Sequence, residues 1–365
     1  MTKTIAMRIN TEPIGSIPRP AELIQGMKAH AEGQIKDKDL EHLFARALAD
    51  TIRRFEETGS PVITDGEQTK PSFATYPISG SKQLNPNGVV IPFADGHTRQ
   101  LPTITGGPFR YQAYASGYLE KAMQLTSLPV KQAVISVSAI SLLYPQGGID
   151  GYTQGQFIAD LLNEAEADIR RCLRAGAYNV QIDFTEARLS LKLDPSGGLL
   201  KAFIDLNNQV LDRFTAEEQR RIGVHSCPGG DHDSTHSADI PYSALLPLLF
   251  QLHAGNFYLE FAGEKDKGAV LASIKENLRP SQHVFLGVTD VLHPRIESAS
   301  EIRDLIVEAA AVLPVGRLGT TDDCGFSPFA DDTSTSRDIA FAKIRARVEG
   351  TKLAEAVLDR TAVSV

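Results

Sequence analysis

The stretch YNVQID (residues 178–183) is a short run with β-branched residues that ends on an acidic residue, and a segment with helical periodicity, 198–214, follows it. The same pair of short run and longer helical segment recurs along the chain. Further strands are expected at 61–64, 133–138, 222–225, 257–260, 284–288 and 317–320, and further helices at 37–58, 156–175, 243–253, 268–278, 300–313 and about 335–358. Seven or eight such units predict an α/β fold and favour a (β/α)8 TIM barrel rather than the alternative, an open doubly wound sheet. The segment around Ile14-Gly15-Ser16 supplies an eighth strand or lies across the barrel mouth.

One segment interrupts this alternation. Residues 77–116 are rich in glycine, proline, asparagine and threonine and contain short alternating runs such as GVVIPFADGHTRQLPTITGG (88–107). This pattern predicts a hairpin-bearing insertion after the first clear strand. We expect the whole chain, 1–365, to form a single catalytic barrel domain that contains this insertion.

Composition narrows the range of partners. The net charge is −8, which argues against nucleic acid or an anionic membrane surface as the main partner. The sequence contains no run of eighteen apolar residues, so it predicts no membrane span. The first residues lack the apolar core of a signal peptide. Three cysteines in 365 residues are not a disulfide framework, so we expect a cytoplasmic protein. The sequence does not reveal the oligomeric state.

Residues that can carry chemistry follow the predicted strands. They are Asp65, Glu67, Asp183, His225, Cys227, Glu260, Asp290, His293 and Cys324. In a barrel the carboxyl ends of the strands surround one rim, and barrel active sites lie on that rim. We therefore expect these side chains to converge on one catalytic site.

Four of these residues suit a metal ion. Alternate side chains of an extended segment point the same way, so His225 and Cys227 can reach one ion, with Glu260 and Cys324 from other strands. Two thiolates, one imidazole and one carboxylate suit zinc, and ligands from several strands favour a catalytic site. The alternative is that the cysteines are small buried apolar residues and His225 is a core histidine.

Two similar features are interpreted as structural. Cys172 lies on the apolar stripe of the predicted helix 156–175, so we assign it to the core. The stretch GGDHDSTHSAD (229–239) resembles a metal loop, but its aspartate and serine content is interpreted as a solvated loop.

Seven segments together resemble the catalytic barrel of the cobalamin-independent methionine synthase family. They are IGSIPRP (14–20), ITDGEQTKPSF (63–73), QIDFTEARL (181–189), GVHSCPGG (223–230), FYLEFAG (257–263), GVTDVLHPRIES (287–298) and TTDDCGF (320–326). The resemblance covers about residues 12–358. It implies a (β/α)8 barrel with a catalytic zinc that transfers an alkyl group to a thiol, most simply a methyl group to homocysteine to give methionine.

The resemblance also implies roles for single residues. The family's zinc ligands fall on His225, Cys227, Glu260 and Cys324, the set already reached from the strand ends. The amino-acid site falls on Ser16, Glu67 and Asp183, where two carboxylates hold the ammonium of homocysteine. The general acid falls on His293, with Asp290 as its orienting partner.

The chain departs from the family pattern in the groups that meet the alkyl donor. The family stacks the pterin of its folate donor on a tryptophan, and this chain has none. Phe73, Tyr76, Tyr144 and Phe184 are candidates to replace it, and a methylated corrinoid is an alternative donor.

A sister branch of the family joins epoxides to coenzyme M, a thiol that carries a sulfonate, and this lyase activity is the alternative function. A sulfonate needs a basic partner, for which Arg19 is the main candidate. Lys70 and Arg295 are further candidates, although an ordinary surface charge is the simpler interpretation of both.

Overall fold

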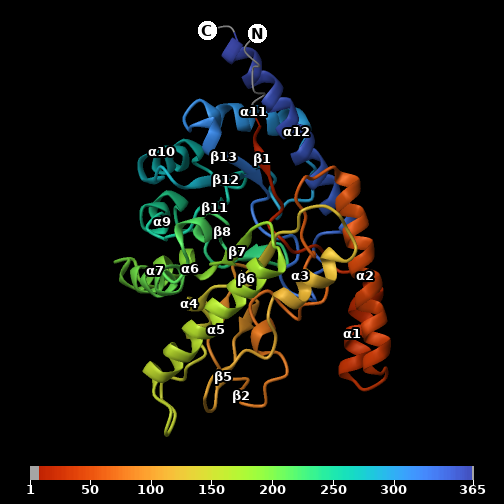
Figure 1. Cartoon of the computed structure of the whole chain (residues 1–365), viewed down its shortest axis with the longest axis vertical. Helices are drawn as coiled ribbons and strands as arrows, with labels where there is room; N and C mark the ends of the chain where they lie inside the picture. The colour runs from red at the N-terminus through yellow and green to blue at the C-terminus, as the bar shows by residue number, and fades with distance from the viewer. Residues whose placement is uncertain (1–7, 364–365) are drawn as a thin grey trace.

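Seven parallel strands form the central sheet of the computed structural model, which describes residues 8–363. In spatial order they are β1 (Asn10–Thr11), β13 (Leu318–Thr321), β12 (His283–Gly287), β11 (Asn256–Leu259), β8 (Ile222–Ser226), β7 (Val180–Asp183) and β6 (Gln132–Ile135). From β6 to β13, each strand of this sheet pairs with the strand of the sheet that follows it in the sequence, as repeated βα units require. The sheet curls on itself, and helices cover its outer face (Figure 1).

The eighth position of the barrel is taken by residues 61–64. Ile63 forms a single parallel bridge to Val130, just before β6. On its other side Thr64 Oγ1 donates to the Gly15 carbonyl at 2.9 Å. The (β/α)8 architecture predicted from the sequence is therefore confirmed.

Two details of the predicted strands are corrected. The expected strand 61–64 is reduced to one bridge, and the first strand of the sheet lies at Asn10–Thr11 rather than around Ile14–Ser16. The ladder beside β13 ends with the bond from Glu12 N to the Thr320 carbonyl, because the next residue, Pro13, has no N–H to donate.

The seven helices that the periodicity predicts are present with boundaries moved by a few residues, and α1, α3 and α6 are additional helices that it did not predict. The longer ones are α1 (Ala21–Ala31), α2 (Asp37–Thr58), α3 (Ser116–Met123), α5 (Gln154–Ala175), α6 (Glu186–Leu193), α7 (Gly198–Leu211), α9 (Tyr242–Leu249), α10 (Lys267–Asn277), α11 (Ala299–Ala310) and α12 (Arg337–Val363). Short turns are η1 (Tyr76–Ile78), α4 (Val137–Ser141), α8 (Ala216–Gln219) and η2 (Val315–Arg317). Gly59 and Gly176 end α2 and α5 in the left-handed conformation that glycine adopts without strain.

The predicted insertion contains two nested antiparallel pairs. The inner pair is β3 (Val90–Pro92) with β4 (Thr98–Gln100), and the outer pair is β2 (Leu84–Asn85) with β5 (Thr103–Ile104). The outer pair lies at the lower edge of Figure 1. The inner hairpin is hydrogen-bonded through Ala94 N to the Thr235 carbonyl of a smaller hairpin, β9 (Gly230–Asp231) and β10 (Ser234–Thr235).

A ladder of acidic residues on α5 holds the end of the insertion. Asp160 accepts a hydrogen bond from Phe109 N, Glu164 from Tyr111 N, and Asp168 from Ala115 N. Asp168 also accepts from the Tyr76 hydroxyl, so one carboxylate contacts both the start and the end of the inserted segment. The spacing of four residues places the three acids on one face of the helix.

The apolar core fills the space between the sheet and the helices. Cys172 is fully buried in it, as expected. Among the described residues, no helix is both long and apolar enough to cross a membrane.

Candidate active site

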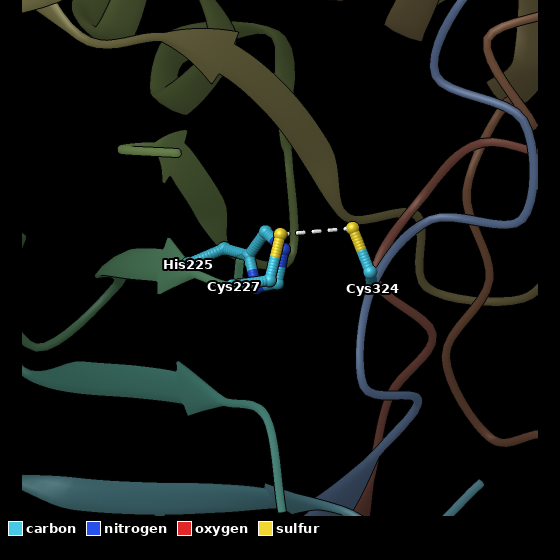
Figure 2. A group of neighbouring side chains, drawn as sticks. All are labelled: His225, Cys227 and Cys324. Carbon is cyan, nitrogen blue, oxygen red and sulfur yellow. Dashed lines mark hydrogen bonds between the residues drawn. The ribbon is translucent and has the colours of Figure 1, made fainter. Parts of the chain in front are cut away.

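Three potential metal ligands converge at the mouth of the barrel. His225 lies in β8, Cys227 directly follows that strand, and Cys324 follows β13. Their ligand atoms lie within 4.8 Å of one another, and the two sulfurs are 2.9 Å apart. Figure 2 shows the three side chains turned toward a common point from two separate segments of the chain. All three are buried.

The His225 ring is oriented to offer a nitrogen lone pair to this point. Its Nδ1 lies 3.1 Å from the Tyr258 carbonyl oxygen. A carbonyl oxygen only accepts hydrogen bonds, so Nδ1 must be the donor. The proton is therefore on Nδ1, and Nε2 is left as an acceptor. Nε2 is buried and has no hydrogen-bond partner. A histidine that donates one ring N–H to a carbonyl and leaves the other nitrogen free is typical of a metal ligand.

The two cysteines differ in their proton affinity. The hydrogen bond between them lowers the pKa of Cys324 well below its usual value and raises that of Cys227. Burial alone would lower the pKa of His225, but the neighbouring Cys324 raises it. The site therefore already favours a thiolate at Cys324, the form of cysteine that binds metals.

Glu260 does not belong to this three-residue group. It directly follows β11, and its Oε2 accepts a hydrogen bond from Arg188 Nη1 at 2.8 Å. Burial raises the pKa of Glu260 well above its usual value, and the nearby Asp323 adds to this effect. The Glu260 carboxyl is thus beside the cluster but engaged by an arginine, and its role as a fourth ligand stays a prediction.

The residues expected to bind the amino acid lie in one cavity with the metal group. Ser16, Glu67 and Asp183 line this cavity together with His225 and Cys324. The cavity therefore joins two carboxylates and a hydroxyl to the potential metal ligands, although these residues come from five distant parts of the sequence.

Glu67 is held in an unusual backbone conformation. Its φ of 56° lies in the left-handed region, which is uncommon for a residue with a side chain. Its carboxylate accepts a hydrogen bond from Lys70 Nζ at 2.9 Å, and both side chains are buried. The sequence-based interpretation of Lys70 as a surface charge is wrong, because its ammonium is enclosed by Glu67, the Ala133 carbonyl and the Tyr76 ring.

Asp183 is buried at the end of β7. Burial raises the pKa of its carboxyl to about 7, although His225 and a hydrogen bond from Gln181 oppose this shift. Gln181 Nε2 donates that bond to Asp183 Oδ1 at 2.7 Å. Gln181 also lines the cavity.

Arg19 does not line the cavity. Its guanidinium donates to three backbone carbonyls, those of Glu67, Lys70 and Phe329, at 2.7–3.2 Å. This geometry leaves Arg19 as a support of the loop that carries Glu67, and the prediction that it contacts substrate is not supported by its position.

His293 and Asp290 line a neighbouring cavity that contains none of the three metal-type ligands. The His293 ring is exposed, and its Nδ1 accepts a hydrogen bond from Arg295 N at 3.1 Å. Asp290 Oδ1 accepts from Leu292 N at 2.9 Å, and no contact joins it to the His293 ring. Both residues lie on the segment after β12, so they share the rim with the metal group.

Comparison with known protein families gives a match over most of the chain. The model of the family described as cobalamin-independent synthase, catalytic domain, matches residues 9–349. The chain belongs to this family.

Curated relatives of this synthase family are longer than the chain. The 5-methyltetrahydropteroyltriglutamate–homocysteine methyltransferase of Neisseria gonorrhoeae is 24% identical over 318 residues, which cover 86% of this chain and 40% of that protein. The enzyme of the same name from Candida albicans is 26% identical over 330 residues, with 86% and 39% covered. The chain thus spans about two fifths of the length of these relatives.

Solved structures of similar fold cover nearly the whole chain. A B12-independent methionine synthase from Shewanella sp. W3-18-1 aligns with a TM-score of 0.74 at 17% identity and covers 98% of this chain and 100% of its own. A protein described as a vitamin-B12-independent methionine synthase from Listeria monocytogenes aligns at 0.69 and 20% identity, with 94% and 96% covered. At these identities the likeness shows the fold.

The cavity is also lined by residues that the sequence analysis did not single out. Ile91, Phe93 and Arg99 of the insertion line it, as does Phe329 after β13. Their positions depend on pairing between distant segments, for which the sequence holds no signal. Gln181 is different, because strand alternation places it on the same face as Asp183, two residues later.

The stretch 229–239 is a further correction. It is not a solvated loop, because Asp231, His236 and Ser237 are buried. Asp231, His232 and Asp332 form a second cluster of ligand types, but Arg99 is bound to it, with its Nε 2.5 Å from Asp231 Oδ2. Asp231 therefore anchors the insertion through this arginine.

Proposed function

We propose that this chain carries zinc-dependent methyl transfer to the thiol of homocysteine, giving methionine. The observation that carries the proposal is the single cavity that holds His225 and Cys324 beside Glu67 and Asp183. A thiol and an ammonium group of one small amino acid can thus be bound at the same time. The names of the relatives support this reaction, since both are homocysteine methyltransferases.

Zinc fits the residues present. The site offers two sulfurs and the free Nε2 of His225, with Glu260 as the proposed fourth ligand. When bound, zinc would deprotonate the substrate thiol, whose ordinary pKa is about 8.5, and keep it as a nucleophile at neutral pH. Glu260 already forms an ion pair with Arg188, so we propose that it contacts the metal only when it gives up part of that pairing.

The amino-acid end of homocysteine would be bound by this chain's own polar groups. Glu67 and Asp183 provide negative charge for the ammonium, and backbone amides near Gly15 and Ser16 suit the carboxylate. Lys70 Nζ donates to the Glu67 carboxylate and holds it in place. These contacts fix the direction from which the sulfur meets the methyl donor.

We propose a methylated folate as donor, following the names of the relatives. Phe73 lines the cavity and packs edge-on against Phe329, with ring centroids 5.6 Å apart. Of the four aromatic residues considered as substitutes for the missing tryptophan, Phe73 is the one that lines this cavity, because Tyr76 and Phe184 are fully buried and Tyr144 packs on Phe157. Phe73 is therefore the proposed contact for the donor's ring.

His293 is the proposed general acid for the departing group. Because its Nδ1 accepts a backbone hydrogen bond, Nε2 is the ring atom that carries the proton. The role requires the segment after β12 to bring this ring toward the cavity. Replacement by glutamine should lower kcat with little change in homocysteine affinity.

The alternative, coenzyme M as thiol, is not favoured by the charges. All three candidate partners for a sulfonate are engaged elsewhere: Arg19 by backbone carbonyls, Lys70 by Glu67, and Arg295 by Glu301. The two carboxylates of the cavity would repel a sulfonate.

Metal analysis and calorimetry test the proposal. We expect about one zinc ion per chain, lost in Cys227→Ser and Cys324→Ser but kept in the control Cys172→Ala, whose thiol lies in the core. L-homocysteine should bind the zinc-loaded protein, and Glu67→Gln should weaken this binding by about 1.5–3 kcal/mol. Binding of coenzyme M without any response to homocysteine would reject the assignment.

A further inference from the structure

A chain of buried polar side chains lies beneath the cavity, inside the barrel. Lys131 directly precedes β6, and its side chain is fully buried. Its ammonium lies 3.8 Å from the centre of the Tyr258 ring and 3.7 Å from Glu12 Oε2. Tyr258 donates to the same Glu12 oxygen at 2.7 Å. The charge of Lys131 is thus matched inside the protein.

Lys131 also determines the orientation of the Gln181 amide. Lys131 Nζ lies 2.8 Å from Gln181 Oε1. An ammonium has three donors and no acceptor, so only the amide oxygen can face it. The amide nitrogen must then point the other way, toward Asp183 Oδ1 at 2.7 Å. Burial lowers the pKa of Lys131 to about 8, while the neighbouring Glu12 opposes this shift.

This orientation has a consequence for Asp183. Gln181 and Asp183 are two residues apart on β7, so both side chains point into the barrel. A donor at Oδ1 fixes the plane of the carboxylate. The second oxygen is left for a ligand in the cavity that both residues line.

We propose that Lys131 and Gln181 are positioning residues that hold the Asp183 carboxylate toward the ammonium group of the thiol substrate. The proposal rests on the proposed function, because it takes an amino-acid thiol as the ligand. Neither residue needs to touch the reacting sulfur. Their effect should appear only with ligands that carry the ammonium.

The test compares two thiols on the zinc-loaded protein by calorimetry. L-homocysteine has the ammonium, and 4-mercaptobutyrate is the same molecule without it. Gln181→Met and Lys131→Met should each weaken L-homocysteine about tenfold and leave 4-mercaptobutyrate within twofold of the wild type. The matched control is Gln132→Met, which replaces a buried glutamine of the neighbouring strand that does not line the cavity.

Each outcome decides between the proposals. Equal weakening of both thiols, or wild-type affinity in Gln181→Met, would refute the positioning role and leave the proposed function intact. A wild-type protein that binds 4-mercaptobutyrate as tightly as L-homocysteine would refute the ammonium contact itself. No binding of either thiol by the wild type would refute the proposed function, and the positioning role with it. Bound zinc and the unfolding midpoint show whether each variant is folded, and Gln181→Met carries the test if Lys131→Met is not.

Discussion

At the scale of single residues, the Glu67–Lys70 pair combines a strained backbone with a buried charge. Glu67 has a left-handed φ. Burial alone would lower the pKa of the Lys70 ammonium, but the nearby carboxylates of Glu67 and Asp65 raise it above its usual value. Such strain persists only where the surroundings determine it, here by Lys70 from one side and Arg19 on the backbone. These contacts therefore hold the Glu67 carboxylate in a fixed position in the cavity.

Removing the Lys70 charge should be costly. In Lys70→Met the Glu67 carboxylate stays buried without its partner, so we expect the free energy of unfolding to fall by about 3–5 kcal/mol. Urea denaturation followed by circular dichroism measures this change. The control Lys201→Met removes an exposed pair with Asp205 on α7 and should cost less than about 1 kcal/mol. Similar losses in both variants would contradict the account.

At the scale of elements, α5 determines how the insertion lies on the barrel. Burial raises the pKa of Asp168 to about 6, while hydrogen bonds from Tyr76 and Ala115 oppose the shift. A carboxyl whose pKa is higher in the folded state stabilises the fold below its unfolded pKa of about 3.9, and this contribution is lost as the pH rises toward 6.

The pH dependence can be measured by comparison with Asp168→Asn, which does not titrate. The stability of the wild type relative to the variant should fall between pH 4 and pH 6.5, by an amount on the order of 2–3 kcal/mol. Urea titrations at several pH values give the difference. A constant difference across this range would show that Asp168 titrates normally.

The inner hairpin of the insertion is held by Arg99. Its guanidinium binds Asp231 and Asp331 and stacks on Phe329, while it also lines the cavity. In Arg99→Met we expect faster hydrogen exchange at 90–100 and 231–235 and weaker binding of the methyl donor, with homocysteine affinity kept. Arg110→Met is the control, because Arg110 lies in the same insertion but pairs with Asp160 outside the cavity. Unchanged exchange in Arg99→Met would exclude this anchoring role.

The sequence predicted these elements better than it predicted their contacts. Strand ends placed His225, Cys227 and Cys324 correctly on one rim, because parallel strands all present their carboxyl ends on the same side. Burial of Lys70 and the anchoring of Arg99 depend on segments far apart in the chain. Periodicity carries no information about such pairings, and for that reason the segment 229–239 was misinterpreted.

At the scale of the whole molecule, the barrel closes between its first and last units. Arg347 of α12 is fully buried, donates to the Glu12 carbonyl and lies 3.2 Å from Asp322 after β13. It therefore links the last helix, the last strand and the first strand. The alternation of runs predicted the barrel, but which side chains join its ends could not be predicted, since a helical arginine is usually exposed.

Arg347→Met should weaken the entire fold. Loss of the buried charge leaves Asp322 without its partner, so we expect the free energy of unfolding to fall by about 3–5 kcal/mol. The control Arg345→Met changes an exposed position two residues earlier on α12 and should alter stability by less than about 0.5 kcal/mol. Equal effects would show that Arg347 does not close the barrel.

The distance between Cys227 and Cys324 along the chain, 97 residues, sets an order of events during synthesis. When the ribosome has released β8, two of the three ligands are already present, but the third is still to be translated. Since β13 pairs with β1, the ring of strands and the cluster are completed by the same late segment. A nascent polypeptide therefore cannot assemble all three residues of the cluster until β13 and Cys324 have been made.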